Sequence, residues 1–179
     1  MNDLLFFLLM LAAVLAVRCF LLSFARVKGR SMLPTLRDRE WLLVWRLPYI
    51  GGRPRRFDVV ICHYPGRRVK RLPFLPQCFV KRVIGLPGET LEVIEGVLHI
   101  DGQPVEEPFL NPQRARFFRN RPAVTLGADE YFVMGDNRDN SNDSRRVGPL
   151  KRRAIIGRVS CVLWPLKNIR RLTPPPSAD

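Results

Sequence analysis

One serine stands in the segment KGRSMLPTL, residues 28–36, among small, apolar and basic neighbours. No histidine lies within thirty residues of Ser31 on either side. A serine hydroxyl becomes a good nucleophile only when a nearby base takes its proton. If Ser31 is catalytic, that base must therefore come from a distant part of the chain.

A buried lysine is one such base. Lysine normally titrates near pH ~10.4, but burial in apolar surroundings disfavours the ammonium form and lowers the pKa. Lys81 lies in the strand-like segment FVKRVIG, residues 79–85. Side chains alternate along a strand, so Lys81 faces the interior with Phe79 and Val83 if Arg82 faces water. This segment alone leaves the reverse arrangement open.

A third polar segment, GDNRDNSNDSR, covers residues 135–145 and directly follows the apolar run YFVM. Asn, Asp and Ser side chains bond to their own backbone and favour turn-rich loops. Within this loop, Ser141 offers a hydroxyl partner for a lysine amine. Asp143 and Arg145 could form an ion pair that stiffens the loop.

Other chemistries have weaker support in the sequence. A Ser-His-Asp triad would need His63 or His99, yet the chain has no G-x-S-x-G turn, and His99 sits in a predicted hairpin strand. The four cysteines lie far apart without a C-x-x-C pair, so we expect no metal site and no cofactor. The sequence leaves open whether Cys62 and Cys78 form a disulfide or whether all four cysteines are free, buried thiols.

The N-terminus predicts a membrane anchor. Residues 4–25 carry a single charge, Arg18, and a helix of that length spans a hydrocarbon core of roughly 30 Å. A removed signal peptide is the alternative, but the start MND lacks basic residues and no A-x-A-like site follows. We therefore expect residues 1–26 to be a single transmembrane helix.

The rest of the chain predicts a mainly β fold. Eight or so short strands, including WLLVWRL, FDVVICHY and YFVMGD, alternate with Gly, Pro and Arg turns. This pattern is typical of a short-stranded antiparallel β barrel or sandwich, here over residues 27–172. Exposed loops are expected at residues 48–56 and 65–77, and a flexible tail at residues 173–179.

The net charge of +14 indicates an anionic partner, either nucleic acid or an anionic membrane, or simply a basic solvated face. No helix-turn-helix or stacking-aromatic motif favours nucleic acid. Five basic residues from Arg26 to Arg39 follow the apolar segment. Read alone, this bias would keep the following domain in the cytoplasm.

Three segments in order, SMLPTL, KRVIGLPGE and GDNRDNSNDSR, resemble the signature boxes of the bacterial type I signal peptidases. The strand RFDVVICHYP is also similar to one of that family, with Phe57 where the family pattern has glycine. The resemblance implies a membrane-bound serine endopeptidase that removes signal peptides after small residues of A-x-A type. Its partners would be secretory preproteins and the phospholipid membrane.

Carried over, the resemblance makes Ser31 the nucleophile and Lys81 its general base. Ser141 would orient the amine, with Asp143 and Arg145 holding the loop. It also implies a single-pass protein of the bacterial inner membrane with its catalytic domain outside the cytoplasm. Long translocated domains often override flanking charge.

The substrate side is less defined. Some family members carry a serine two residues before the nucleophile as an oxyanion-hole donor, whereas this chain has Gly29. The Ser31 N–H can still donate, which leaves the second donor unassigned, and Gly29 allows a turn that a β-carbon forbids. Met32 and Leu33 are expected to wall the substrate pockets or dip into lipid.

Two alternative functions stay open, one enzymatic and one not. One is a Ser/Lys peptidase of the self-cleaving repressor type, which would carry a DNA-binding or soluble N-terminal arm. The other is a non-catalytic, membrane-anchored basic protein that binds polyanions.

Overall fold

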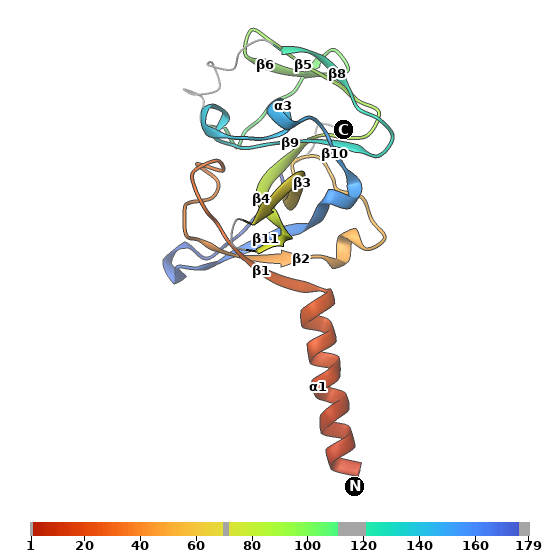
Figure 1. Ribbon diagram of the computed structural model, residues 1–179. Coiled ribbons are helices and arrows are strands. Elements are labelled where there is room, and N and C mark those ends of the chain that lie inside the picture. The colour runs from red at the N-terminus through yellow and green to blue at the C-terminus, as the bar shows by residue number, and fades with distance from the viewer. Residues whose placement is uncertain (1, 70–71, 111–120, 176–179) are drawn as a thin grey trace.

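The computed structural model describes residues 2–69, 72–110 and 121–175. Figure 1 shows one long helix that stands away from a body made of strands. The helices are α1 (Asn2–Phe20) and α3 (Ser144–Val147), and single turns of 3-10 helix are η1 (Leu47–Tyr49), η2 (Arg138–Asn140), η3 (Arg152–Ala154) and η4 (Leu166–Asn168). The strands are β1 (Leu22–Arg26), β2 (Trp41–Trp45), β3 (Val59–Val69), β4 (Leu72–Gly85), β5 (Thr90–Ile94), β6 (Val97–Ile100), β7 (Gln103–Pro104), β8 (Arg121–Thr125), β9 (Glu130–Met134), β10 (Leu150–Lys151), β11 (Ile155–Trp164) and β12 (Arg170–Arg171).

Helix α1 is shorter than the sequence predicted. It ends at Phe20, and the apolar residues that follow form strand β1, which pairs with β2 from Leu22↔Trp45 to Arg26↔Trp41. The run LLSFA is compatible with either structure, and the pairing partner selects the strand. Within the described residues, no helix has the length and hydropathy that a membrane crossing requires.

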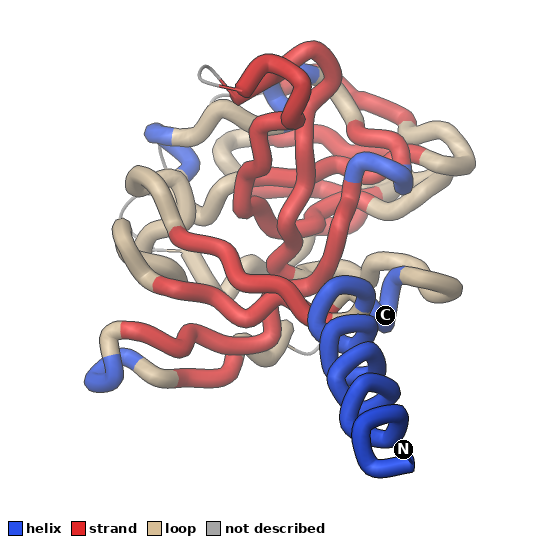
Figure 2. Tube along the Cα trace, turned by 60° about the horizontal axis from the view of Figure 1, so that its bottom comes forward, coloured by secondary structure: helices blue, strands red, loops and turns tan. Residues whose placement is uncertain are grey.

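The larger sheet is antiparallel and has the strand order β1-β2-β11-β3-β4-β9-β10, with β12 added to β11. Its two ends do not meet, so the barrel alternative of the prediction does not form as a closed barrel, while the predicted mainly antiparallel β fold is confirmed. Figure 2 shows how the strands cross the body and how α1 joins it at one end. The smaller sheet has the order β7-β6-β5-β8.

Three strands are longer than the short-stranded pattern predicted: β3, β4 and β11 have 11, 14 and 10 residues. Strands β3 and β4 continue well into the segment expected to be an exposed loop at residues 65–77. The Pro and Arg residues there lie on the outer part of this long hairpin. Because its backbone groups pair across the hairpin, polar side chains do not prevent strand formation.

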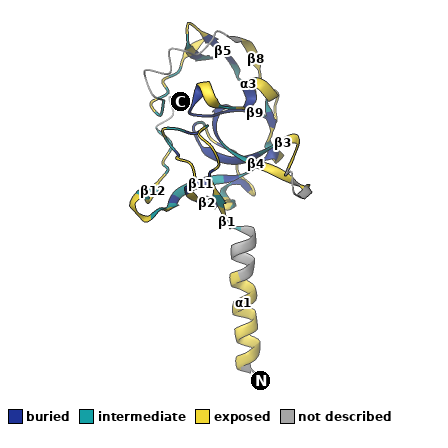
Figure 3. Ribbon diagram, turned by 60° about the vertical axis from the view of Figure 1, so that its left-hand side comes forward, coloured by how far each residue is buried: buried dark blue, intermediate teal, exposed yellow. Residues whose placement is uncertain are grey.

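Side-chain alternation explains the strands of the larger sheet. Along β2, Leu42 and Val44 are buried, whereas Trp41 and Trp45 are exposed. Burying one such aliphatic side chain contributes roughly 1.5–3 kcal/mol. Strand β9 differs, because four successive residues are buried on both faces. Figure 3 shows the buried stretches gathered in the body, while the N-terminal part of α1 is exposed.

The buried residues form three apolar clusters. The first lies on one face of β3 and β4 and includes Val60, Cys62 and Val83. The second joins the opposite face of β4 to the smaller sheet, and the third lies beneath the Ser31 segment. Strand β4 is therefore covered on both faces, a condition that shapes the site described next.

The cysteines Cys62, Cys78 and Cys161 are free, so the possible Cys62–Cys78 disulfide does not form. Cys62 is buried, but Cys78 is exposed, which corrects the alternative of uniformly buried thiols. In the β3–β4 pair, Cys62 lies opposite Phe79 and Cys78 lies opposite His63. The two thiols thus belong to adjacent positions of the ladder, with different exposure.

Candidate active site

The Ser31 segment is a compact turn between β1 and β2. Val27 and Glu40 close its base with a backbone hydrogen bond of 2.8 Å. Gly29 has φ +91°, a left-handed conformation that strains residues with a β-carbon, as the sequence predicted. Its N–H donates to Asp38 Oδ1 at 2.8 Å. The Gly29 N–H is therefore already engaged, and the second oxyanion-hole donor stays unassigned.

Lys81 meets Ser31 directly. The Lys81 Nζ atom lies 2.9 Å from Ser31 Oγ, although fifty residues separate them in the chain. Strand β4 presents Lys81 on the same face as Val83, and the lysine side chain is only 3% exposed. This distance is that of a hydrogen bond. The arrangement brings a serine hydroxyl and a lysine amine into reach for proton transfer.

Burial lowers the pKa of Lys81, because the ammonium form loses its hydration. The carboxylates of Asp143 and Asp136 oppose this shift, and the Arg145 guanidinium adds to it, yet the net direction is downward. A lowered pKa increases the fraction of neutral amine near neutral pH. The buried amine is therefore a better proton acceptor than an exposed lysine.

Arg82 is the main surprise of the site. The sequence pattern expected one of Lys81 and Arg82 to face water, but Arg82, like Lys81, is only 3% exposed. Its guanidinium donates to both oxygens of Asp136, at 2.9 and 2.7 Å, and to Phe57 O at 2.9 Å. Its Cζ atom also lies 3.9 Å from the centre of the Phe109 ring. Alternation holds, but both faces of β4 are covered, so Arg82 is buried as an ion pair.

The loop after β9 holds the Ser31 segment in place. The Asn137 backbone N–H donates to the Ser31 carbonyl at 3.0 Å, and its side-chain amide donates to the Arg30 carbonyl at 3.0 Å. Sequence reasoning did not single out Asn137. Its signal was membership of the polar loop, in which several Asn and Asp residues look alike. Asn137 thus holds the backbone of Arg30 and Ser31 in place.

Asp143 and Arg145 lie together as the sequence predicted. Arg145 donates to both carboxylate oxygens of Asp143, each at 2.8 Å, and the Gly135 N–H donates to Asp143 at 2.9 Å. Burial alone would raise the pKa of Asp143, but the Arg145 and Gly135 contacts outweigh it and lower that pKa. The carboxylate therefore stays ionised and ties the end of β9 to helix α3.

Ser141 packs near the Ser31 segment and forms no hydrogen bond with the Lys81 amine. Its hydroxyl oxygen is buried and has no hydrogen bond of acceptable geometry within the described residues, although it is near enough to Asp143 to help lower that pKa. A β-carbon on Gly135 would lie 2.3 Å from Ser141 Oγ and 2.4 Å from the Ser31 carbonyl oxygen. Ser141 and Ser31 thus pack against the same glycine. The expected Ser141 contact with Lys81 stays a prediction.

Two further expectations meet different outcomes. Met32 is 1% exposed and belongs to the third apolar cluster, so it cannot dip into lipid. Leu33 is half-buried next to it.

The two histidines contact other groups. His99 Nδ1 lies 3.1 Å from the backbone oxygen of Val97, and His63 lies opposite Cys78 in the β3–β4 hairpin. Lys81, rather than a histidine, is the described partner of Ser31.

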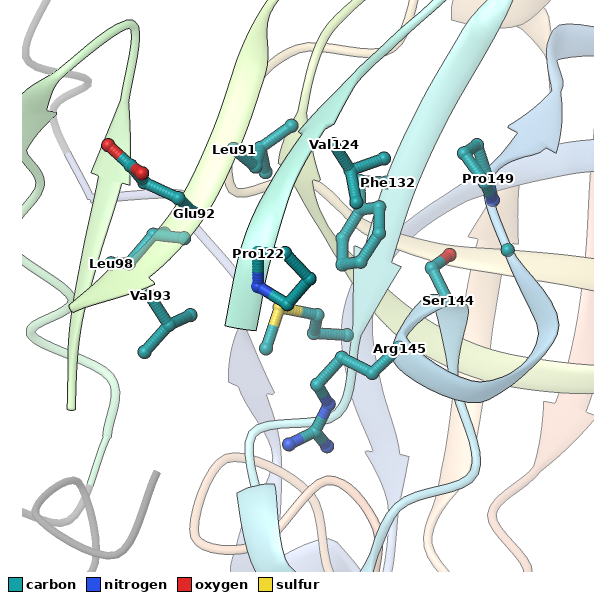
Figure 4. Close-up of a pocket in the computed structure, with 12 residues that line it drawn as sticks. Leu91, Glu92, Val93, Leu98, Pro122, Val124, Phe132, Ser144, Arg145 and Pro149 are labelled. Atoms are coloured by element: carbon teal, nitrogen blue, oxygen red, sulfur yellow. The ribbon is translucent and has the colours of Figure 1, made fainter. Parts of the chain in front are cut away.

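A separate cavity of about 220 Å³ lies behind this loop. Figure 4 shows it between the smaller sheet, represented by Leu91, Val93 and Val124, and the β9–α3 region with Phe132 and Arg145. Neither Ser31 nor Lys81 lines it. The described residues also contain no group of three or more His, Cys, Asp or Glu side chains that could hold a metal ion.

Comparison with known proteins agrees with this geometry. Residues 1–164 match the model of the family described as signal peptidase, peptidase S26. The chain is 39% identical over 163 residues to a signal peptidase I of Leptolyngbya laminosa, covering 91% of this chain and 79% of the relative. It is 34% identical over 166 residues to a signal peptidase I of Bacillus caldolyticus, covering 87% and 86%.

Among solved structures, the fold is similar to a signal peptidase I from Enterococcus faecalis, with a TM-score of 0.50 and 30% identity over 60% of this chain and 97% of that one. The family match spans the helix, the Ser31 turn, β4 and the loop after β9. Taken with the relatives, it shows that the chain belongs to the signal peptidase family, peptidase S26, and is a serine endopeptidase that removes signal peptides.

Proposed function

We propose that Ser31 and Lys81 are the catalytic dyad of this peptidase and that the chain cleaves exported preproteins after small residues. The observation that carries the proposal is the distance of 2.9 Å between Lys81 Nζ and Ser31 Oγ, at an amine whose pKa burial lowers. This pair supplies the nucleophile and the base that acyl transfer requires.

The reaction then follows from the two groups. Ser31 Oγ attacks the scissile carbonyl while the Lys81 amine takes the hydroxyl proton. The resulting ammonium gives that proton to the leaving amine, and an acyl-enzyme ester forms at Ser31. Neutral again, Lys81 takes a proton from water, which attacks the ester. The Lys81 ammonium returns that proton to Ser31 Oγ as the ester bond breaks, and the new carboxyl end of the substrate is released and ionises to a carboxylate. The Ser31 N–H is the oxyanion donor that the chain itself can supply.

The substrate would lie as an extended strand beside Ser31. Strand β1 pairs only with β2, and β4 pairs with β9 only from Arg82 to Gly85. Residues 78–81 therefore keep one backbone edge unpaired within the described part of the chain. An extended peptide can add to such an edge through main-chain hydrogen bonds. Ala25 and Val80, both apolar and partly buried, would limit the room for side chains near Ser31.

A membrane anchor is the second part of the proposal, with α1 as the inserted segment. Its residues from Leu4 to Leu11 are apolar and exposed. On the body, Trp41 and Trp164 face each other across β2 and β11 and are 42% and 54% exposed. Tryptophan is enriched at membrane–water interfaces. The family match also begins at residue 1, so it includes α1.

The body would then lie on the extracytoplasmic face of the bacterial inner membrane, with one pass through it. Signal peptides of exported chains are released on that side, and the dyad must reach them there. Basic residues just after α1 favour the opposite orientation, but a long translocated domain overrides such a bias. Secretory preproteins and phospholipid would be the partners.

The two rival functions make different use of these residues. A self-cleaving repressor-type peptidase would share the dyad but not the family match over residues 1–164. A polyanion-binding protein would keep its binding after Ser31→Ala. It also gives no reason for a buried lysine amine 2.9 Å from Ser31 Oγ.

The test is cleavage of a purified preprotein in detergent by the full chain and its variants. Ser31→Ala and Lys81→Met should each lose at least about 10²–10⁴-fold in kcat/KM, the range that general-base catalysis contributes. Lys81→Met keeps the apolar stem of the side chain and removes only the amine. Ser23→Ala on β1 and Lys151→Ala on β10 are the matched controls and should keep full activity. Full activity in either dyad variant would end the assignment.

A further inference from the structure

A basic cavity of about 910 Å³ opens where the body meets helix α1. The segment from Pro48 to Asp58 forms most of its wall, and the rest comes from Trp45, Leu86, Pro87, Glu89, Tyr131 and Arg158. All of these residues lie within the described part of the chain. Neither Ser31 nor Lys81 lines the cavity, so it is distinct from the dyad.

Two contacts place this cavity close to the end of α1. The Arg46 N–H donates to the Leu21 carbonyl at 2.9 Å, one residue after the helix ends. Trp45 lies opposite Leu22 in the β1–β2 pair. Figure 1 shows the segment after β2 above the top of α1. Leu47 and Ile50, at the start of the same segment, are exposed apolar residues. The rim of the cavity therefore lies at the level where an inserted helix leaves the hydrocarbon.

The charge in the cavity is positive and only partly neutralised. Arg53 and Arg55 are exposed, and their guanidinium groups form no hydrogen bond or ion pair with any described residue. Arg158 Nη1 reaches Asp58 Oδ1 only at 3.8 Å. Four guanidinium groups thus line one hollow, those of Arg53, Arg55, Arg56 and Arg158, and among the described residues Arg53 and Arg55 have no partner.

The acidic groups of the cavity already have partners. Asp58 Oδ2 accepts from the Tyr49 hydroxyl at 2.6 Å and from the Arg55 backbone N–H at 3.0 Å. Glu89 pairs with both terminal nitrogens of Arg56. These carboxylates therefore do not neutralise the side chains of Arg53 and Arg55, which remain available to an external anion.

We propose that this cavity binds the phosphate of an anionic phospholipid headgroup. The proposal rests on membrane attachment through α1. Arg53 and Arg55 would donate to the phosphate oxygens, because a guanidinium presents two parallel donors that match a phosphate. Trp45 would lie beside the glycerol and upper acyl region, where amphipathic rings are favoured. Binding there would fix the rotation of the body about the axis of α1.

The test titrates the full chain, held in nonionic detergent micelles, with short-chain phosphatidylglycerol while calorimetry measures Kd. An arginine near an anionic surface contributes about 1 kcal/mol, so removing both in R53Q/R55Q should weaken binding about 30-fold. R67Q/R68Q loses the same charge on exposed residues of the β3–β4 hairpin and should bind as the wild type does. R53K/R55K keeps the charge but not the paired donors, and should lose most of the affinity.

Three results would overturn the proposal. The first is equal weakening by R67Q/R68Q, which would indicate diffuse surface charge. The second is full affinity in R53K/R55K. The third is inorganic phosphate alone binding as tightly as the lipid, which would indicate a free-phosphate site. Thermal unfolding of each variant shows that the fold is retained.

Insertion of the chain into vesicles of phosphatidylcholine alone tests α1 separately, because micelle titration does not depend on it. The preprotein cleavage assay with the Ser31→Ala variant tests the proposed dyad. Lipid binding by Ser31→Ala should equal that of the wild type. Failure of the headgroup site and failure of the proposed function therefore give different results.

Discussion

Gly135 is the residue whose substitution tests the site most sharply. It follows β9 and lies between Ser31 and Ser141, with no room for a side chain. A β-carbon there would lie 2.4 Å from the Ser31 carbonyl oxygen and 2.3 Å from Ser141 Oγ. The replacement Gly135→Ala therefore forces at least one of these groups to move.

The size of the movement follows from the distances. An ordinary carbon–oxygen contact is about 3.4 Å or longer, so the Ser31 carbonyl must shift by about 1 Å. The same carbonyl accepts from the Asn137 N–H at 3.0 Å, so that bond lengthens or breaks. A misplacement of about 1 Å at a reacting group costs about 10²-fold in rate. Overpacking of this kind destabilises a fold by about 1–3 kcal/mol.

The assay compares kcat/KM on a preprotein with the free energy of unfolding in urea. For Gly135→Ala we expect kcat/KM to fall about 10²-fold while the protein stays folded at the assay temperature. Gly51→Ala is the control, since a β-carbon at Gly51 meets nothing within 4 Å. Wild-type kcat/KM in Gly135→Ala would refute the packing described around Ser31.

Three further predictions test the electrostatics of the site. Because the proposed mechanism needs neutral Lys81, activity should fall on acidification. Arg145→Gln should move that fall to higher pH, since the Arg145 charge helps to lower the pKa of Lys81; a pH–kcat/KM profile that does not move would contradict this. Asp136→Ala leaves the buried arginine of β4 without its partner and should cost about 3–5 kcal/mol in unfolding free energy, measured by denaturant titration. Cys78 is exposed and should react with iodoacetamide in the native protein. Cys62 is buried, and burial raises its pKa to about 12, so it should react only after unfolding. Mass spectrometry of the labelled peptides shows which of the two cysteines has reacted.

The sequence predicted the chemistry of the site better than its surroundings. Ser31, Lys81 and the Asp143–Arg145 pair were singled out from residue type and from the resemblance of three ordered segments to a known family. The structure brings Ser31 to Lys81 and Asp143 to Arg145. Alternation placed Lys81 with Val83, and the structure has that arrangement. The second covered face of β4 could not be predicted, because it depends on residues packed there from distant segments.

Three other features could not be predicted from the sequence, because each depends on tertiary contacts or strand pairing. Asn137 lies among several Asn and Asp residues with equal turn propensity, and only the tertiary contact with Ser31 distinguishes it. The end of α1 at Phe20 depends on the pairing of β1 with β2, since the apolar residues after Phe20 suit a helix equally well. The long β3–β4 hairpin likewise depends on pairing across Pro- and Arg-rich sequence.

The burial of Lys81 also links folding to protonation. In an unfolded chain this lysine would titrate at its ordinary pKa, whereas burial lowers the folded value. Between the two pKa values folding therefore releases protons, and by linkage the folded state gains stability as pH rises from the folded pKa toward the unfolded one. Acidification thus weakens the fold down to the folded pKa, and the folded amine becomes protonated as pH falls through that value. In the proposed mechanism the amine becomes a base only after β4 is enclosed, so a newly made chain would have no working nucleophile until its folding is complete.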